Sequence, residues 1–64
     1  MNKEEISALL DQLKEGVISE LHVSKEDFLT VREVIVARSD FKHFRGVAER
    51  GGSVMYRYME NPRS

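Results

Sequence analysis

The C-terminal third of the chain contains the residue types best suited to contact with a partner. Basic residues and tyrosines are interleaved there, at Lys42, Arg45, Arg50, Tyr56, Arg57 and Tyr58. Arginine and tyrosine are enriched at the centres of protein–protein interfaces. Arginine can also hold phosphates while tyrosine rings stack on bases. We predict that these six residues form a partner-binding site, with a protein partner favoured over nucleic acid.

The acidic residues are not arranged for catalysis. General acid–base chemistry needs paired carboxylates, or a histidine beside a carboxylate, inside a pocket. The acids of this chain instead follow predicted helix surfaces, as Asp11 and Glu15 do, and no serine lies in a Gly-x-Ser-x-Gly turn. A chain of 64 residues also leaves little room for an enclosed cleft. We predict that the protein is not an enzyme and has no catalytic residues.

Metal and cofactor sites are not expected either. The chain has no cysteine, and its two histidines, His22 and His43, have no companion ligand at helical spacing. We expect His22 to lie at the end of the first helix and His43 to be exposed or to face a partner. Arg50-Gly51-Gly52 weakly resembles phosphate-binding and RNA-binding glycine motifs, but we favour the interpretation that its glycines form a turn. We predict no metal and no cofactor.

Charge is divided unevenly along the chain. The net charge is −1, but residues 1–37 contain four basic and eight acidic residues, whereas residues 38–64 contain six basic and three acidic residues. The two halves attract each other, or else the C-terminal half is a basic docking face for an acidic partner. The low net charge argues against strong nucleic-acid binding.

The first 21 residues have the pattern of an amphipathic helix. Apolar residues recur at spacings of four and three, at Ile6, Leu10, Leu13, Val17 and Leu21. This spacing predicts a helix over residues 3–21. Gly16 lies inside the pattern, where it costs about 1 kcal/mol relative to alanine.

A second helix is predicted over residues 25–38, antiparallel to the first. Ser24 followed by Asp27 resembles a helix start signal. The run Val34-Ile35-Val36 is β-branched, so a strand is the alternative for this segment. The cap and the short break after the first helix favour the helix.

Residues 40–50 allow two interpretations. Helical spacing of Phe41, Phe44 and Val47, with Ser39 before them and Gly51 after them, predicts a third, short helix. The alternative is a β-hairpin with a strand over 42–49, a turn over 50–53 and a strand over 54–59, for which Gly51-Gly52 suits the turn. The first strand would lack polar alternation, so we favour the helix.

The pattern of residues 53–59 predicts a strand. Val54, Tyr56 and Tyr58 would lie on one face of it, and Met55, Arg57 and Met59 on the other. A strand needs partners for its backbone groups. Either residues 42–49 provide a second strand, or another molecule does. We therefore hypothesise that this segment takes part in self-association, as in a homodimer.

We thus expect one domain over residues 1–64 that is mainly α with a small β element (α+β). It consists of an antiparallel helix pair, a third short helix and a C-terminal strand or β-hairpin, with residues 60–64 as a disordered tail. The expected core is Ile6, Leu10, Leu13, Val17, Leu21, Phe28, Val31, Ile35, Phe41, Phe44 and Val47.

The predicted function is that of a small regulatory or adaptor-type interaction module that self-associates through its C-terminal segment. The alternative is a small nucleic-acid-binding regulator of the helix-turn-helix kind, in which the third helix would read the major groove. No segment has the length and polarity of a membrane span or signal peptide. We expect a cytoplasmic protein without membrane partners.

Overall fold

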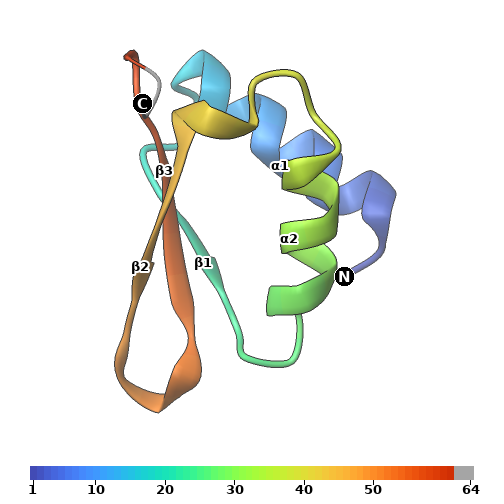
Figure 1. Ribbon diagram of the computed structural model, residues 1–64, viewed down its shortest axis with the longest axis vertical. Coiled ribbons are helices and arrows are strands. Elements are labelled where there is room, and N and C mark those ends of the chain that lie inside the picture. Colours follow the sequence, from blue (N-terminus) through green and yellow to red (C-terminus); the bar gives the residue numbers. More distant parts are fainter. Residues whose placement is uncertain (62–64) are drawn as a thin grey trace.

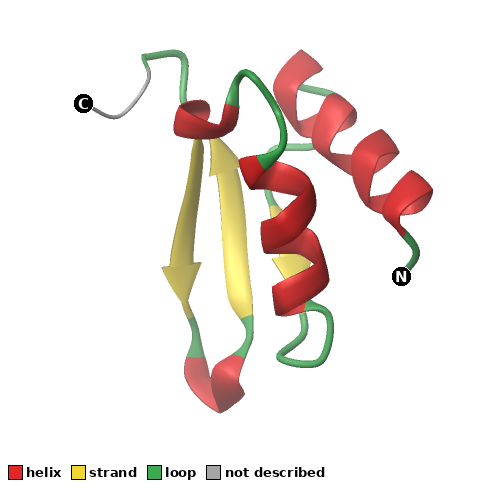
Figure 2. Ribbon diagram, turned by 45° about the vertical axis from the view of Figure 1, so that its right-hand side comes forward, coloured by secondary structure: helices red, strands yellow, loops and turns green. Residues whose placement is uncertain are grey.

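Two helices lie on one face of a three-stranded sheet in the computed structural model, which describes residues 1–61 (Figures 1 and 2). The elements in chain order are α1 (Lys3–Glu15), β1 (Leu21–Val23), α2 (Phe28–Val36), the 3₁₀ turn η1 (Phe41–His43), β2 (Phe44–Ala48), the 3₁₀ turn η2 (Arg50–Gly52) and β3 (Val54–Tyr58). The chain is therefore a small α+β fold. The tail predicted over residues 60–64 lies outside the described residues from 62 onward.

The prediction of a third helix over residues 40–50 is wrong, because this segment forms η1, β2 and η2. The alternative hairpin describes it instead. Gly51 and Gly52 have φ values of +82° and +87° and close the turn, and the Glu49 amide donates to the Ser53 carbonyl at 2.8 Å. Apolar and polar residues do not alternate along β2 for two reasons. Gly46, on the side of the helices, has no apolar side chain, and Val47, on the opposite side, is apolar but exposed.

Helix α1 ends at Glu15, six residues before the predicted end at residue 21. Gly16 is the reason, since it adopts φ +81° and its amide donates to the carbonyls of Gln12 and Leu13. The glycine thus ends the helix and does not lie inside it. The following residues turn back and form β1, so His22 is a strand residue and not the end of a helix.

Strand β3 lies in the centre of the sheet, whose order is β1-β3-β2. Both neighbours are antiparallel to it, with Tyr56 opposite Leu21 on one side and opposite Gly46 on the other. Residues 54–58 thus form a strand with partners within the chain on both sides, and the alternative in which residues 42–49 provide a second strand is the one observed. The two edges of the sheet are β1 and β2.

The predicted antiparallel helix pair is also wrong. Both helices run from the lower to the upper part of the views in Figures 1 and 2, because β1 carries the chain back between them. Helix α2 spans Phe28–Val36 and is shorter than the predicted 25–38. The Ser24 hydroxyl does donate to Asp27, at 3.0 Å, but this contact lies in the turn that precedes the helix.

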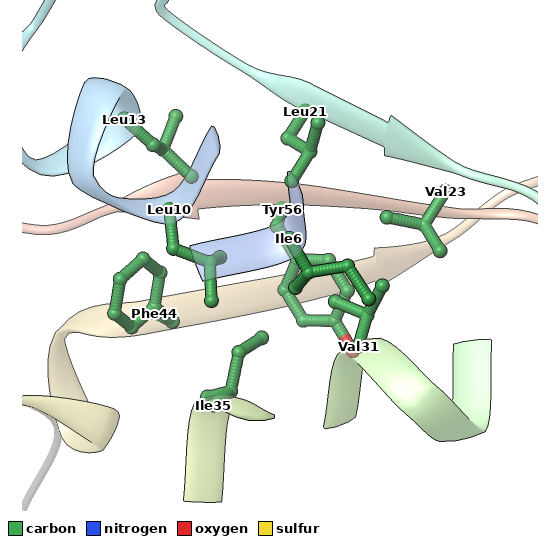
Figure 3. Close-up of a cluster of buried hydrophobic side chains, with 9 residues drawn as sticks. All are labelled: Ile6, Leu10, Leu13, Leu21, Val23, Val31, Ile35, Phe44 and Tyr56. Atoms are coloured by element: carbon green, nitrogen blue, oxygen red, sulfur yellow. The ribbon is translucent and has the colours of Figure 1, made fainter. Parts of the chain in front are cut away.

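The core lies between the helices and the sheet, where side chains from both layers point toward one another (Figure 3). Its buried members are Ile6, Leu10, Leu13, Leu21, Val23, Val31, Ile35, Phe44 and Tyr56. Three predicted core residues are exposed, namely Val17, Phe41 and Val47. Val17 follows the end of α1, Phe41 belongs to η1, and Val47 points away from the helices.

One arginine joins α1 to the segment that follows α2. The guanidinium group of Arg38 donates to Asp11 at 2.8 Å and to Asp40 at 2.9 Å, and it lies 5.5 Å from the centre of the Phe44 ring. Its side chain is 18% exposed. The hydrogen bond from Arg38 lowers the pKa of Asp40. This contact places η1 and the start of β2 against the helices.

Candidate functional site

The helices leave part of the sheet uncovered on the side of β2. A groove of about 460 Å³ lies between α2 and β2. Residues from the helix, the connecting segment and the sheet line it, including Phe28, Arg32, Val36, Phe41, Phe44 and Tyr56. Gly46 and Ala48 also line it and are exposed, although their positions in β2 face the helix side. The groove is therefore a gap in the helix layer over the edge of the sheet.

The floor of the groove is formed by Tyr56 and Gly46. A Cβ atom placed on Gly46 would lie 2.9 Å from Cε1 of Tyr56, so the ring covers the glycine. Burial raises the pKa of the Tyr56 hydroxyl, and the nearby Arg32 charge acts in the opposite direction. The floor is consequently an apolar aromatic surface with a neutral hydroxyl.

Exposed apolar side chains stand at the sides of this groove. Val36 is 58% exposed and Phe41 is 39% exposed. Contiguous exposed apolar surface next to a concave site is typical of binding sites. Arg32 is the charged residue among the described lining residues. The groove can thus bury apolar groups while it presents one positive charge.

The backbone edge of β2 borders the groove. Hydrogen bonds join Met59 to His43 and Glu49 to Ser53 across the hairpin. Hydrogen-bonded and non-bonded positions alternate along an antiparallel pair. The backbone N–H and C=O groups of Arg45 and Val47 therefore point toward β3, whereas those of Phe44, Gly46 and Ala48 point outward from the sheet edge. The Phe44 amide donates to the Phe41 carbonyl in η1. By this alternation, the amides of Gly46 and Ala48 point away from β3.

The predicted basic residues lie along β2 and on the sheet face opposite the helices. Lys42 precedes β2 and Arg50 follows it, and both are exposed. Arg45 lies directly opposite Arg57 in the register, on the open face. Arg57 contacts Glu20 at 3.5 Å. Lys42, Arg45 and Arg50 therefore follow the exposed edge, whereas Arg57 belongs to the centre of the open face.

The two predicted tyrosines lie on the helix side of the sheet, away from Arg45 and Arg57. Tyr56 is 7% exposed and belongs to the core. Tyr58 is half-buried, stacks on His43 with ring centres 5.0 Å apart, and meets Phe44 edge-on. The structure thus does not bring the six predicted residues together on one surface.

The sequence prediction missed the helix wall of the groove, which Phe28, Arg32 and Val36 provide. The signal was present in the sequence, because the apolar residues of α2 cover a broad face. Packing against α1 and the sheet buries only part of such a broad apolar face. Val36 belongs to the part of this face that stays exposed.

A hydrogen-bonded network crosses the open face of the sheet. His22 contacts Glu49 through Nδ1 at 3.1 Å and Glu20 through Nε2 at 3.0 Å. Hydrogen bonds to Glu20 and then Glu49 raise the pKa of His22, and the bond to His22 is the main cause that lowers the pKa of Glu20. The network joins both sheet edges across β3.

No group of three or more ligating side chains in the described part of the chain is arranged to hold a metal ion. His43 is engaged elsewhere, since its Nδ1 lies 2.7 Å from the Met59 carbonyl oxygen. None of the helices within residues 1–61 has the length and apolar character needed to cross a membrane.

Fold and groove together define a small α+β domain that presents an apolar groove beside an exposed strand edge. The chain belongs to the YkzS-like protein family, whose model matches residues 3–57. This match covers both helices, β1, β2 and most of β3. No curated protein and no solved structure is significantly similar to the chain.

Proposed function

We propose that the protein is a small, non-catalytic protein–protein interaction module of the regulatory or adaptor type. Its contact surface is the α2–β2 groove together with the outward edge of β2. One observation supports this above all, namely that exposed apolar side chains lie beside strand amides that point outward at the edge of the sheet. Both kinds of group gain from contact with a second polypeptide.

The physical gain is substantial for so small a surface. Val36 and Phe41 are exposed, and full burial of such a side chain contributes about 1.5–3 kcal/mol. A strand added to β2 would also satisfy the backbone groups of Gly46 and Ala48. Val36 and Phe41 line the same groove as Gly46 and Ala48, so a single bound segment can reach all of them.

The alternative of a helix-turn-helix regulator has less support. It requires a recognition helix over residues 40–50, and this segment forms β2 and two short turns. Self-association remains a form of the proposed function, with β2 and not β3 as its edge. We also propose a cytoplasmic location, which the lack of cysteine supports.

Capture of partners from the native cell tests the proposal. Tagged wild-type protein is compared with Val36→Lys, which places a charge in the groove, and with Val17→Lys, which changes an exposed valine that does not line it. Proteins captured by the wild type and by Val17→Lys should be lost with Val36→Lys. Circular dichroism verifies that all three are folded. Equal capture by all three would contradict the proposed surface.

A further inference from the structure

We infer that the groove binds an extended acidic segment of a partner protein, which adds to β2 as an antiparallel strand. This inference rests on the proposed function and names the chemistry of the partner. It follows from three features of the same edge, which are its backbone geometry, the alternation of its side chains and its charge.

The backbone of β2 is suited to accept a further strand. The amides of Gly46 and Ala48 face away from β3, and β2 is an edge strand of the sheet, so they point to the side where a further strand could pair. Protein edges are commonly protected by proline, by a bulge or by a covering segment. The pairing of β2 with β3 is continuous from Phe44 to Ala48 and contains neither a proline nor a bulge. An added strand therefore meets a regular template.

The side chains of an added strand would alternate between two different surroundings. Those on the helix side would enter the groove, where Phe41, Val36 and the Tyr56 ring favour apolar groups. Those on the other side would lie beside Arg45 and Val47 on the open face. The Tyr56 ring lies over Gly46, so an incoming residue would meet an aromatic surface there. The preferred segment thus alternates apolar and acidic residues.

Charge selects an acidic partner. Four basic residues lie in the groove or along the β2 edge, and none of them forms an ion pair among residues 1–61: Arg32 in the groove, and Lys42, Arg45 and Arg50 at the edge. The acid at this edge, Glu49, is hydrogen-bonded to His22. A carboxylate on the bound segment would meet cations that have no competing partner.

A second copy of the chain fits this edge less well. If two β2 strands paired antiparallel about Gly46, the end of β2 that follows Lys42 in each copy would lie beside the end that precedes Arg50 in the other, which would bring these like charges toward each other. Like charges placed opposite each other across a strand pair are destabilising. Charge complementarity therefore favours a different, acidic polypeptide.

Two synthetic ten-residue peptides test the inference, one alternating valine with aspartate and one alternating valine with lysine. Binding is measured by fluorescence anisotropy at low salt, and contact by amide hydrogen exchange. The aspartate peptide should bind at least about tenfold more tightly than the lysine peptide, and more weakly when salt is added. Exchange of the Gly46 and Ala48 amides should slow when it binds.

Two variants locate the binding. Ala48→Pro removes an outward amide without removing a bond to β3, and should weaken binding of the aspartate peptide at least about tenfold. Arg45→Glu should reduce the preference for the aspartate peptide over the lysine peptide, and it keeps the test decisive if the proline variant does not fold. Lys14→Glu on α1 makes the same charge change at a residue that does not line the groove, and should not change the preference.

The outcomes are distinct. Failure of the aspartate peptide to bind, or equal binding of both peptides, would overturn the inference. In that case the proposed function would still be supported if Val36→Lys loses the partners that the wild type captures. A concentration-dependent dimer in sedimentation that Ala48→Pro abolishes would also overturn the inference, in favour of a second copy as the occupant.

Discussion

Gly46 lies directly opposite Tyr56 in the β2–β3 register, and the Tyr56 ring covers it so closely that a Cβ atom at position 46 would stand 2.9 Å from Cε1. The glycine is therefore required by contact with an aromatic ring and not by its backbone angles. The same contact forms the floor of the groove. Stability of the hairpin and shape of the groove consequently depend on one residue pair.

Gly46→Ala should destabilise the protein by about 1–3 kcal/mol, because the new methyl group overpacks the ring. A strand position would ordinarily gain from this substitution. Chemical denaturation measures the change. In a double-mutant cycle with Tyr56→Leu, which removes the ring, most of the cost of the alanine should disappear. An unchanged free energy of unfolding in Gly46→Ala would contradict the close contact.

Gly16→Ala should cost about 1 kcal/mol for a different reason. Gly16 has φ +81°, and no atom lies within 4 Å of a Cβ placed on it. The cost is thus confined to the left-handed backbone conformation, which is unfavourable for alanine. Gly16→Asn should be milder, since asparagine tolerates this conformation better. Thermal unfolding distinguishes the two variants, and equal melting temperatures for alanine and glycine would refute the cap.

Arg38→Lys should destabilise the fold by about 1–2 kcal/mol although it keeps the charge. A lysine cannot reproduce the fork that reaches Asp11 and Asp40 together, nor the contact with the Phe44 ring. Arg45→Lys, at an exposed position, serves as the matched control and should be neutral. The free energy of unfolding in urea reports both. Similar values for the two variants would show that the fork does not matter.

Stability should depend on pH through His22. Its pKa in the folded state is raised above the usual value of about 6.5 by Glu20 and Glu49. A raised folded-state pKa means that the stabilising contribution is complete below about pH 6.5 and is lost as pH rises through the folded-state value. The melting temperature should therefore fall between pH 6 and pH 8 from this cause.

His22→Gln is the control for this dependence, since glutamine does not titrate. The decrease in melting temperature between pH 6 and pH 8 should become smaller in the variant. The pH dependence of stability that arises from Glu20 has the opposite sign. The pKa of Glu20 is lowered in the folded state, so its stabilising contribution is lost as the pH falls below the usual pKa range of a glutamate. A decrease of the same size in His22→Gln and wild type would remove His22 as the cause.

The helices could be predicted from sequence in part, and their ends could not. Regular apolar spacing from Ile6 to Leu13 identifies α1 because this face is buried. The apolar spacing continues to Leu21, which is also buried, but Leu21 belongs to strand β1 and not to the helix. The sequence pattern alone does not show that Gly16 adopts a left-handed conformation and ends the helix. The same spacing thus arises from two elements.

The hairpin and the groove depend on contacts between distant residues. Phe41, Phe44 and Val47 have helical spacing, but pairing with β3 outweighs this local preference. The basic residues of the C-terminal half could be identified from composition alone. The groove could not, because it exists only where α2 fails to cover β2, and that depends on how the layers pack.

Amide hydrogen exchange of the protein with a captured partner tests the contact surface most directly. Hydrogen exchange of the Gly46 and Ala48 amides at the β2 edge should slow strongly when the partner is bound. The amide of His22, which faces outward at the β1 edge by the same alternation, should be unchanged. Protection at His22 with none at Gly46 and Ala48 would contradict the assignment of the contact surface to β2.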